Sequence, residues 1–183
     1  MARPPGKSNA PVKKRSTDKA AKIVALQDPY EILRLENQLC FALYAATRAM
    51  TKTYRLRLEP LNLTYPQYLV LIVLWEQDGV TVSDIGQRLM LDSGTLTPLL
   101  KRLERMGLVR RERSHDDERE VRISLTEKGR GLRDEARDAR LFVACRLGMS
   151  EAAIRDLRAD LMDMVRQLDA AEVEADVEAV PED

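Results

Sequence analysis

The first part of the chain carries apolar residues at helical spacing. Asp28 and Pro29 form a helix-start signal, because an aspartate caps the first turn and proline suits the first helical position. From there apolar residues recur every three or four positions. The pattern predicts one long amphipathic helix that runs to about Leu58 and is stopped by Pro60.

The next segment is apolar on nearly every side. Thr64 and Gln67 stand at the spacing of a capping box, and Leu63 and Tyr68 are placed as a hydrophobic staple. The run "YLVLIVLWE" therefore predicts a buried helix that ends near Gly79.

Two short helices joined by a tight turn come next. The first begins after Thr81, and the second is capped by Asp92 and ended by Gly107. Because only residues 90–92 separate the two helices, we expect a helix-turn-helix over residues 81–107.

The period of the pattern changes after the helix-turn-helix. Apolar and charged residues alternate on both sides of the polar stretch "SHDDE", which predicts a two-stranded hairpin over residues 108–125. A hairpin directly after a helix-turn-helix indicates a winged helix. The alternative is a solvated, charged hairpin that has no part in DNA binding.

A long helix is predicted from Thr126 to Gly148, and Ser150 caps a last one. The expected fold class is therefore mainly α with a small β-hairpin wing. Residues 28–171 would form a winged helix-turn-helix domain flanked by N- and C-terminal dimerisation helices.

The flanking helices are too apolar to remain in water, so we expect them to bury against a second copy of the chain. A twofold homodimer would present two recognition helices about 34 Å apart, which is one turn of DNA. Such a dimer would read a palindromic double-stranded operator.

Composition and charge add few constraints. The 30 basic and 30 acidic residues cancel, so net charge neither favours nor excludes nucleic acid. We expect a disordered basic arm over residues 1–27 and an acidic tail over residues 172–183. No run of about 18 apolar residues occurs, and the stretch "MARPPGKSNAPVKKRSTDKA" lacks the apolar region of a secretory signal, so we expect neither a membrane span nor such a signal. Two cysteines and one histidine make no metal set. These features indicate a soluble, cytoplasmic protein without metal, cofactor or membrane partner.

The amino end of a recognition helix contacts base edges in the major groove of DNA. Small hydroxyl side chains stand there, followed one turn later by two cations. These candidate DNA-binding residues are Ser93, Thr95, Thr97, Lys101 and Arg102.

The predicted wing offers a further contact. Arg119, near the tip, is suited to a narrow minor groove, where the negative potential is strongest. Asp117 is placed to orient that arginine. His115 is expected to be a surface residue without a role.

The segment from Val80 to Gly129 closely resembles the MarR family of winged-helix transcriptional regulators, and "DER" followed by "VRISLTEKG" is a specific signature of that family. The resemblance extends over about residues 30–170. Within the family, the segment "NQLCFALYAATRAMTKTYRLRLEPLNLTYPQYLVLIVLWE" is similar to the organic hydroperoxide resistance regulators. This resemblance implies a thiol-based repressor that leaves DNA when its sensing cysteine is oxidised.

The resemblance assigns four residues. Cys40 stands where the peroxide-reactive cysteine stands, and Tyr54 and Tyr65 match the tyrosines that hydrogen-bond it from the partner subunit. Cys145 matches the resolving cysteine of the two-cysteine branch. The apolar neighbours Phe41, Leu43, Tyr44 and Trp75 are candidates for a pocket that prefers organic peroxides.

Helix geometry agrees with contacts between subunits. Cys40 and Tyr54 share one helix face, but a rise of 1.5 Å per residue separates them by about 21 Å. They can meet only if two long helices cross in the dimer. A phenol that donates to sulfur favours the reactive thiolate. We do not expect the helix macrodipole to contribute, because the predicted helix begins more than two turns before Cys40.

We expect oxidation to form a sulfenic acid on Cys40 and then a disulfide with Cys145 of the other subunit. If the two residues are further apart in the reduced dimer than a disulfide allows, closing the bond would move the recognition helices and weaken DNA binding. The main alternative is a MarR-type repressor released by a reversibly bound aromatic or phenolic ligand, with both cysteines serving only as packing. A thiol peroxidase and an architectural DNA-binding dimer are further alternatives.

Overall fold

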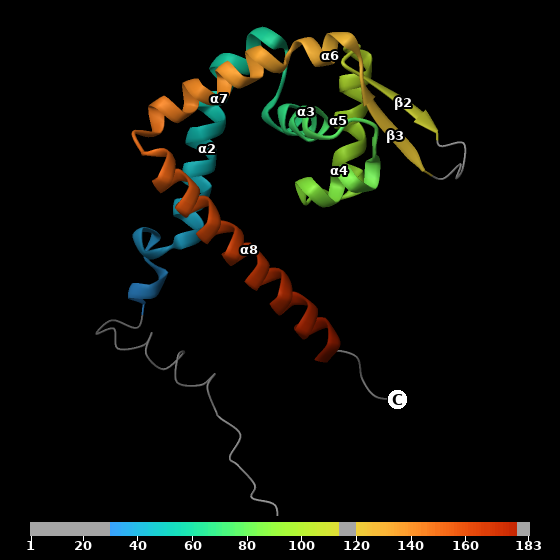
Figure 1. Cartoon of the computed structure of the whole chain (residues 1–183). Helices are drawn as coiled ribbons and strands as arrows, with labels where there is room; N and C mark the ends of the chain where they lie inside the picture. Colours follow the sequence, from blue (N-terminus) through green and yellow to red (C-terminus); the bar gives the residue numbers. More distant parts are fainter. Residues whose placement is uncertain (1–29, 114–119, 179–183) are drawn as a thin grey trace, which may run out of the picture. The chain divides into compact units, whose positions relative to one another are not determined.

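The computed structural model describes residues 30–113 and 120–178, and the chain divides into two compact units, Met1–Ala49 and Met50–Asp183. Figure 1 shows the succession of helices and the small sheet. The predicted fold class, mainly α with a β-hairpin wing, is confirmed. The helix-start signal at Asp28 and Pro29 and the basic arm lie outside the described residues.

The first long helix begins later than predicted. Two 3₁₀ helices, η1 (Glu31–Leu33) and η2 (Leu35–Asn37), precede α2 (Leu39–Leu58). The backbone is extended at Arg34 and Gln38, and Asn37 Nδ2 donates to the Glu31 carbonyl over 2.9 Å. Such side-chain bonds to the backbone compete with the helical pattern. The prediction of one helix from residue 29 is therefore wrong at its start, while its end at Leu58 is confirmed.

The buried helix is α3 (Tyr65–Glu76), which follows the short η3 (Glu59–Leu61). Gln67 Oε1 accepts a hydrogen bond from Thr64 N–H over 2.9 Å, as the capping-box spacing predicts. The helix ends at Glu76, three residues before the predicted end, because Gln77 adopts an extended conformation.

The helix-turn-helix is confirmed as α4 (Val82–Leu89) and α5 (Ser93–Arg105). Thr81 Oγ1 accepts from Asp84 N–H over 3.0 Å at the start of α4. Gly107 follows α5 with a φ of +69°, a conformation that ends a helix at little cost for glycine.

The wing belongs to a sheet of three strands rather than two. Strands β2 (Val109–Arg113) and β3 (Val121–Leu125) form the predicted hairpin, and β1 (Val80–Thr81) pairs with β3, so the antiparallel order is β1-β3-β2. Two residues are too short to show an alternating pattern, which is why the sequence did not predict β1. Residues 114–119, which include the predicted tip, lie outside the described residues.

The helical segment after Thr126 is divided. It forms α6 (Glu127–Gly131) and α7 (Arg133–Leu147), with Leu132 between them at φ −77° and ψ 0°. Gly131 directly before Leu132 weakens the helix there. The prediction of one continuous helix to Gly148 is therefore wrong.

The last helix, α8, covers Glu151–Glu178, and Ser150 Oγ accepts from Ala153 N–H over 3.1 Å, as a capping residue does. This helix continues into the segment that the sequence assigns to the acidic tail.

The core of the second unit lies among α3, α4, α5 and the sheet, which pack on one another (Figure 1). Its largest fully buried apolar side chains include Leu71, Leu74, Ile85, Leu96, Leu100, Leu103, Leu108 and Ile123. This core holds α5 and the wing on one rigid support.

Candidate nucleic-acid interface and thiol site

The amino end of α5 is fixed by its capping residue. Asp92 Oδ1 accepts from Thr95 N–H over 2.9 Å, and Asp92 Oδ2 accepts from the Thr95 hydroxyl over 2.8 Å. These hydrogen bonds hold the pKa of Asp92 below its ordinary value, so the carboxylate stays charged at neutral pH. The Thr95 hydroxyl therefore keeps only its acceptor capacity for a base or phosphate.

The predicted DNA-binding residues of α5 lie on its accessible surface. Ser93, Thr95, Lys101 and Arg102 are exposed, and Thr97 is half-buried. An α-helix turns about 100° per residue, so Ser93, Thr97 and Lys101 form one flank and Thr95 and Arg102 the other.

Between these two flanks, directly opposite the buried leucines of α5, lie Gly94, Pro98 and Arg105. Pro98 and Arg105 are exposed. They were not predicted as DNA-binding residues, although the positions of the buried leucines could have indicated this outermost face.

The described part of the wing adds further cations. Arg110, Arg113 and Arg122 are exposed on β2 and β3. Arg111 lies against α5, with its guanidinium 3.9 Å from the Glu104 carboxylate. The predicted contacts Arg119 and Asp117, together with His115, lie outside the described residues.

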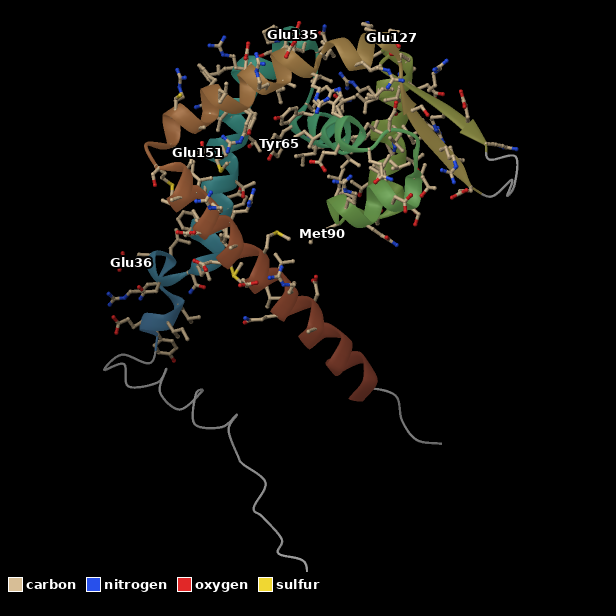
Figure 2. The ribbon with its side chains drawn as sticks, in the orientation of Figure 1. Glu36, Tyr65, Met90, Glu127, Glu135 and Glu151 are labelled. Carbon is tan, nitrogen blue, oxygen red and sulfur yellow. The ribbon has the colours of Figure 1, made fainter. Side chains whose placement is uncertain are left out.

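The structure brings the two predicted tyrosines together. The rings of Tyr54 on α2 and Tyr65 on α3 are 4.9 Å apart, and Figure 2 labels Tyr65 at the start of α3. Tyr68 completes a cluster, 5.5 Å from Tyr54 and 6.0 Å from Tyr65. Tyr68 was predicted only as a packing residue, but its position one turn after Tyr65 could have indicated a place beside it. We call these three residues the tyrosine cluster.

The environment keeps these phenols protonated. Burial raises the pKa of Tyr54 and Tyr65, and it raises the pKa of Tyr68 to about 12. The positive charge of the half-buried Arg140 on α7 opposes this effect at all three residues. A side-chain hydrogen bond between Tyr54 and Tyr68 lowers the pKa of Tyr54 and raises that of Tyr68.

Both cysteines are free thiols and are exposed in the single chain. Cys40 belongs to the first compact unit and Cys145 to the second, in which the tyrosine cluster lies. Cys40 is the second residue of α2, so the argument that it lies more than two turns into a helix is wrong. The positive end of the helix macrodipole is at this residue.

Two arginine side chains lie over the aromatic ring of Phe142, which is on the same helix as Cys145. The guanidinium carbon of Arg57 lies 4.1 Å from the centre of the Phe142 ring, and that of Arg146 lies 3.6 Å from it. Local sequence patterns do not predict this cluster, because Arg57 and Phe142 are far apart in the sequence.

The residues proposed for the peroxide pocket have different environments. Phe41 and Tyr44 are exposed and Leu43 is half-buried in the first unit. Trp75, in the second unit, donates its indole N–H to the Gly129 carbonyl over 3.0 Å. Within residues 30–113 and 120–178 no group of three metal-ligating side chains occurs. No helix in this part of the chain has both the length and the apolar character needed to cross a membrane.

Comparisons with known proteins identify the family. The family model for the transcriptional regulator SarA/Rot matches residues 52–136. The organic hydroperoxide resistance transcriptional regulator of Bacillus subtilis is 50% identical over 133 residues, which are 73% of this chain and 88% of that protein.

Solved structures agree with this result. Reduced AbfR bound to DNA, a protein of Staphylococcus epidermidis, has a TM-score of 0.65 at 37% identity and covers 75% of this chain and 96% of its own. The disulfide-formed AbfR gives a TM-score of 0.55 at 38% identity, over 74% of this chain and 95% of that one.

CouR from Rhodococcus jostii RHA1, bound to p-coumaroyl-CoA, has a TM-score of 0.64 at 27% identity over 72% of this chain and 94% of its own. The matched family model and the Bacillus subtilis relative are those of transcriptional regulators and not of enzymes. The chain therefore belongs to the MarR family of winged-helix DNA-binding transcriptional regulators, and it is similar to the organic hydroperoxide resistance regulators.

Proposed function

We propose that this regulator is a cytoplasmic homodimeric repressor that binds a palindromic operator and releases it when an organic hydroperoxide oxidises Cys40. The observation that carries the proposal is the pairing of Tyr54 with Tyr65, 4.9 Å apart, in a chain that keeps Cys40 as a free, exposed thiol. The 50% identity to the Bacillus subtilis regulator supports the choice of oxidant.

The apolar surface of the first unit supports a homodimer. Seven large apolar side chains among its described residues are exposed by 41% to 70% of their area, which is unfavourable for a single chain in water. The residues are Tyr30, Ile32, Leu33, Leu35, Leu39, Phe41 and Tyr44. A second copy that covers this surface would bring Cys40 of one subunit to Tyr54 and Tyr65 of the partner subunit.

The chemistry begins with the Cys40 thiolate, which attacks an oxygen of the hydroperoxide. The O–O bond breaks, Cys40 becomes a sulfenic acid, and the alkoxide takes up a proton and leaves as an alcohol. The thiolate of the partner subunit's Cys145 then attacks the sulfenic sulfur, forming the disulfide and releasing hydroxide, which is protonated to water. Two thiols thus supply the two electrons that reduce the peroxide.

The tyrosine cluster suits the first step. Because burial keeps Tyr54 and Tyr65 protonated at neutral pH, both are able to donate hydrogen bonds to the Cys40 sulfur. A disulfide requires Cα atoms about 4.4–6.8 Å apart, so its formation would fix the relative position of two helices from different subunits. This constraint would move the two α5 helices out of the spacing that the operator requires.

On the DNA side, we propose base contacts from Ser93, Thr95 and Thr97, with Lys101 and Arg102 on bases or phosphates. Arg119, oriented by Asp117, would enter the minor groove. The DNA-bound AbfR structures support this use of a winged helix.

The interface is tested by anisotropy titrations with the operator at several salt concentrations. K101A should weaken binding and lower the slope of log Kd against log salt by about one per subunit. The matched control E127Q, an exposed residue of α6, should leave both quantities unchanged. Equal affinity and slope for K101A and the unaltered protein would contradict the assigned interface.

The redox step is tested on non-reducing gels after treatment with cumene hydroperoxide. The unaltered protein should form a covalent dimer that dithiothreitol reverses, and neither C40S nor C145S should form it. A covalent dimer in C145S would overturn the assigned disulfide.

The second candidate function is release by a reversibly bound aromatic ligand, which the similarity to CouR bound to p-coumaroyl-CoA favours. In that case C40S would respond to the inducer as the unaltered protein does.

A further inference from the structure

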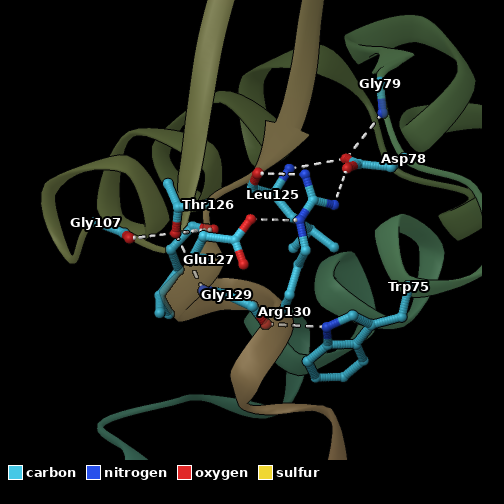
Figure 3. Close-up of polar contacts among 10 residues, drawn as sticks. Trp75, Asp78, Gly79, Gly107, Leu125, Thr126, Glu127, Gly129 and Arg130 are labelled. Atoms are coloured by element: carbon cyan, nitrogen blue, oxygen red, sulfur yellow. Dashed lines mark hydrogen bonds and ion pairs between the residues drawn. The ribbon is translucent and has the colours of Figure 1, made fainter.

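Three side chains connect the base of the wing to the end of α3 and to α6. Asp78 follows α3 and pairs with Arg130 of α6, and Trp75 donates to the backbone of Gly129 (Figure 3). We call Trp75, Asp78 and Arg130 the wing anchor. The contacts of Asp78 and Arg130 belong neither to the interface nor to the thiol site described above, while Trp75 is also a candidate for the peroxide pocket.

The wing anchor takes the place of a longer β1 strand. The register pairs Val80 with Ile123 and Thr81 with Arg122, so continuing β1 backwards would place Asp78 opposite Leu125. The backbone does not continue in that way, because Gly79 turns it with a φ of +72°.

Side chains of the wing anchor supply the hydrogen bonds that a longer β1 would make to the backbone of Leu125. Asp78 Oδ1 accepts from Leu125 N–H over 2.8 Å, and Arg130 Nη2 donates to the Leu125 carbonyl over 3.2 Å. The last residue of β3 is thus held on both of its backbone polar groups by an ion pair (Figure 3).

The electrostatics of Asp78 agree with this geometry. Burial alone would raise its pKa, but the hydrogen bonds from Leu125, Arg130 and Gly79 outweigh burial and hold the pKa below its ordinary value. The carboxylate is therefore charged, and acts only as an acceptor, throughout the neutral range.

The start of α6 is fixed at the same place. A Cβ on Gly129 would lie 2.1 Å from the Leu108 carbonyl oxygen, so only glycine allows this approach of α6 to the residue before β2. The Thr126 hydroxyl donates to the Gly107 carbonyl over 2.7 Å. Both strands of the hairpin are thus held at their base, and Trp75 links this base to α3.

We propose that Trp75, Asp78 and Arg130 are positioning residues for DNA binding, which set the angle of the wing so that the wing and α5 contact the same duplex. This inference rests on the proposed DNA interface. A five-residue strand is about 17 Å long, so a tilt of about 10° at its base moves its far end by about 3 Å. A displacement of that size breaks a direct hydrogen bond or ion pair.

The test compares D78N, R130Q and W75F with the matched control E127Q. Glu127 is 3.5 Å from Arg130, but its side chain is 96% exposed and makes no contact with Leu125 in the described hydrogen bonds. Each anchor variant should bind the operator about five- to tenfold more weakly and lose about one unit of salt slope per wing, while E127Q should match the unaltered protein.

A double-mutant cycle separates a positioning role from a purely structural one. D78N added to R119A should cause no further loss, since the wing contact is already absent, whereas D78N added to K101A should multiply the two losses. Titrations are made well below the lowest melting temperature of the set, so that folded proteins are compared. Amide exchange at Leu125 should accelerate in D78N and not in E127Q.

The two proposals fail in different ways. If K101A and R119A weaken binding but D78N, R130Q and W75F bind as E127Q does, the wing anchor is overturned and the interface stands. Losses from D78N and R119A that multiply would also overturn the wing anchor. If K101A and R119A both leave binding unchanged, the interface fails and this inference fails with it.

Discussion

Residues 30–49 and the winged helix place their apolar side chains in opposite ways. In the winged helix, from α3 to α6, side chains such as Leu71, Leu100 and Ile123 are fully buried, and Met90 is its one large apolar side chain exposed among the described residues. Between residues 30 and 49, side chains such as Leu33 and Tyr44 are 70% and 56% exposed. The winged helix therefore completes its core within one chain, whereas the described part of the first unit leaves apolar side chains exposed, which is what the proposed dimer would cover.

The largest effect is expected from damage inside the winged helix. L100A removes a fully buried side chain between α5 and the rest of the core and should lower the free energy of unfolding by about 3 kcal/mol. Urea denaturation checks this value, with the exposed Q87A as control. A loss no larger than that of Q87A would show that this core is not self-contained.

A smaller effect, of a different kind, is expected from the first unit. F41D places a charge on its apolar surface and should weaken dimerisation about thirtyfold, which corresponds to about 2 kcal/mol. Sedimentation at several concentrations measures this change, with the exposed E36Q as control. An unchanged dimer would exclude this surface as the interface.

Loss of the capping hydrogen bond at the start of α4 should lower the free energy of unfolding by less than L100A does. T81V keeps the shape of the side chain but removes the acceptor for Asp84 N–H at the start of α4, so it should lower the free energy of unfolding by about 1 kcal/mol. The exposed S83A is the control in thermal unfolding. If T81V and S83A had the same melting temperature, the capping hydrogen bond would contribute nothing measurable to the stability of the fold.

The smallest effect at neutral pH is expected from Y68F. Because the pKa of Tyr68 is raised to about 12 in the folded chain, the folded state retains a proton that the unfolded state loses near pH 10. Stability should therefore be complete below pH 10 and fall as pH rises toward 12, and Y68F should reduce this fall. Melting temperatures between pH 8 and 12 test this, and identical profiles would contradict the burial of the phenol.

The same contrast explains what the sequence could predict. The starts and ends of α4 and α5 were predicted well because Thr81, Asp92 and Gly107 act on neighbouring residues. The late start of α2 was missed, because the extended conformations of Arg34 and Gln38 interrupt a pattern that looks continuous.

Local sequence patterns could not predict contacts between residues that are far apart in the sequence. The pairing of β1 with β3 joins residues more than 40 positions apart, and Asp78 meets Arg130 across 52 positions. Tyr54 and Tyr65 came from the family resemblance, and the structure places them in contact. The effect of the Arg140 charge on these tyrosines appears only in three dimensions, because Arg140 lies on α7, far from them in the sequence.

The central claim is that the oxidation state of Cys40 controls operator binding. The most direct measurement is an anisotropy titration of the operator at fixed salt, with reduced protein, after cumene hydroperoxide, and after dithiothreitol, for the unaltered chain and C40S. We expect oxidation to abolish binding, reduction to restore it, and C40S to bind in all three conditions. Equal binding by the oxidised and reduced unaltered protein would contradict it.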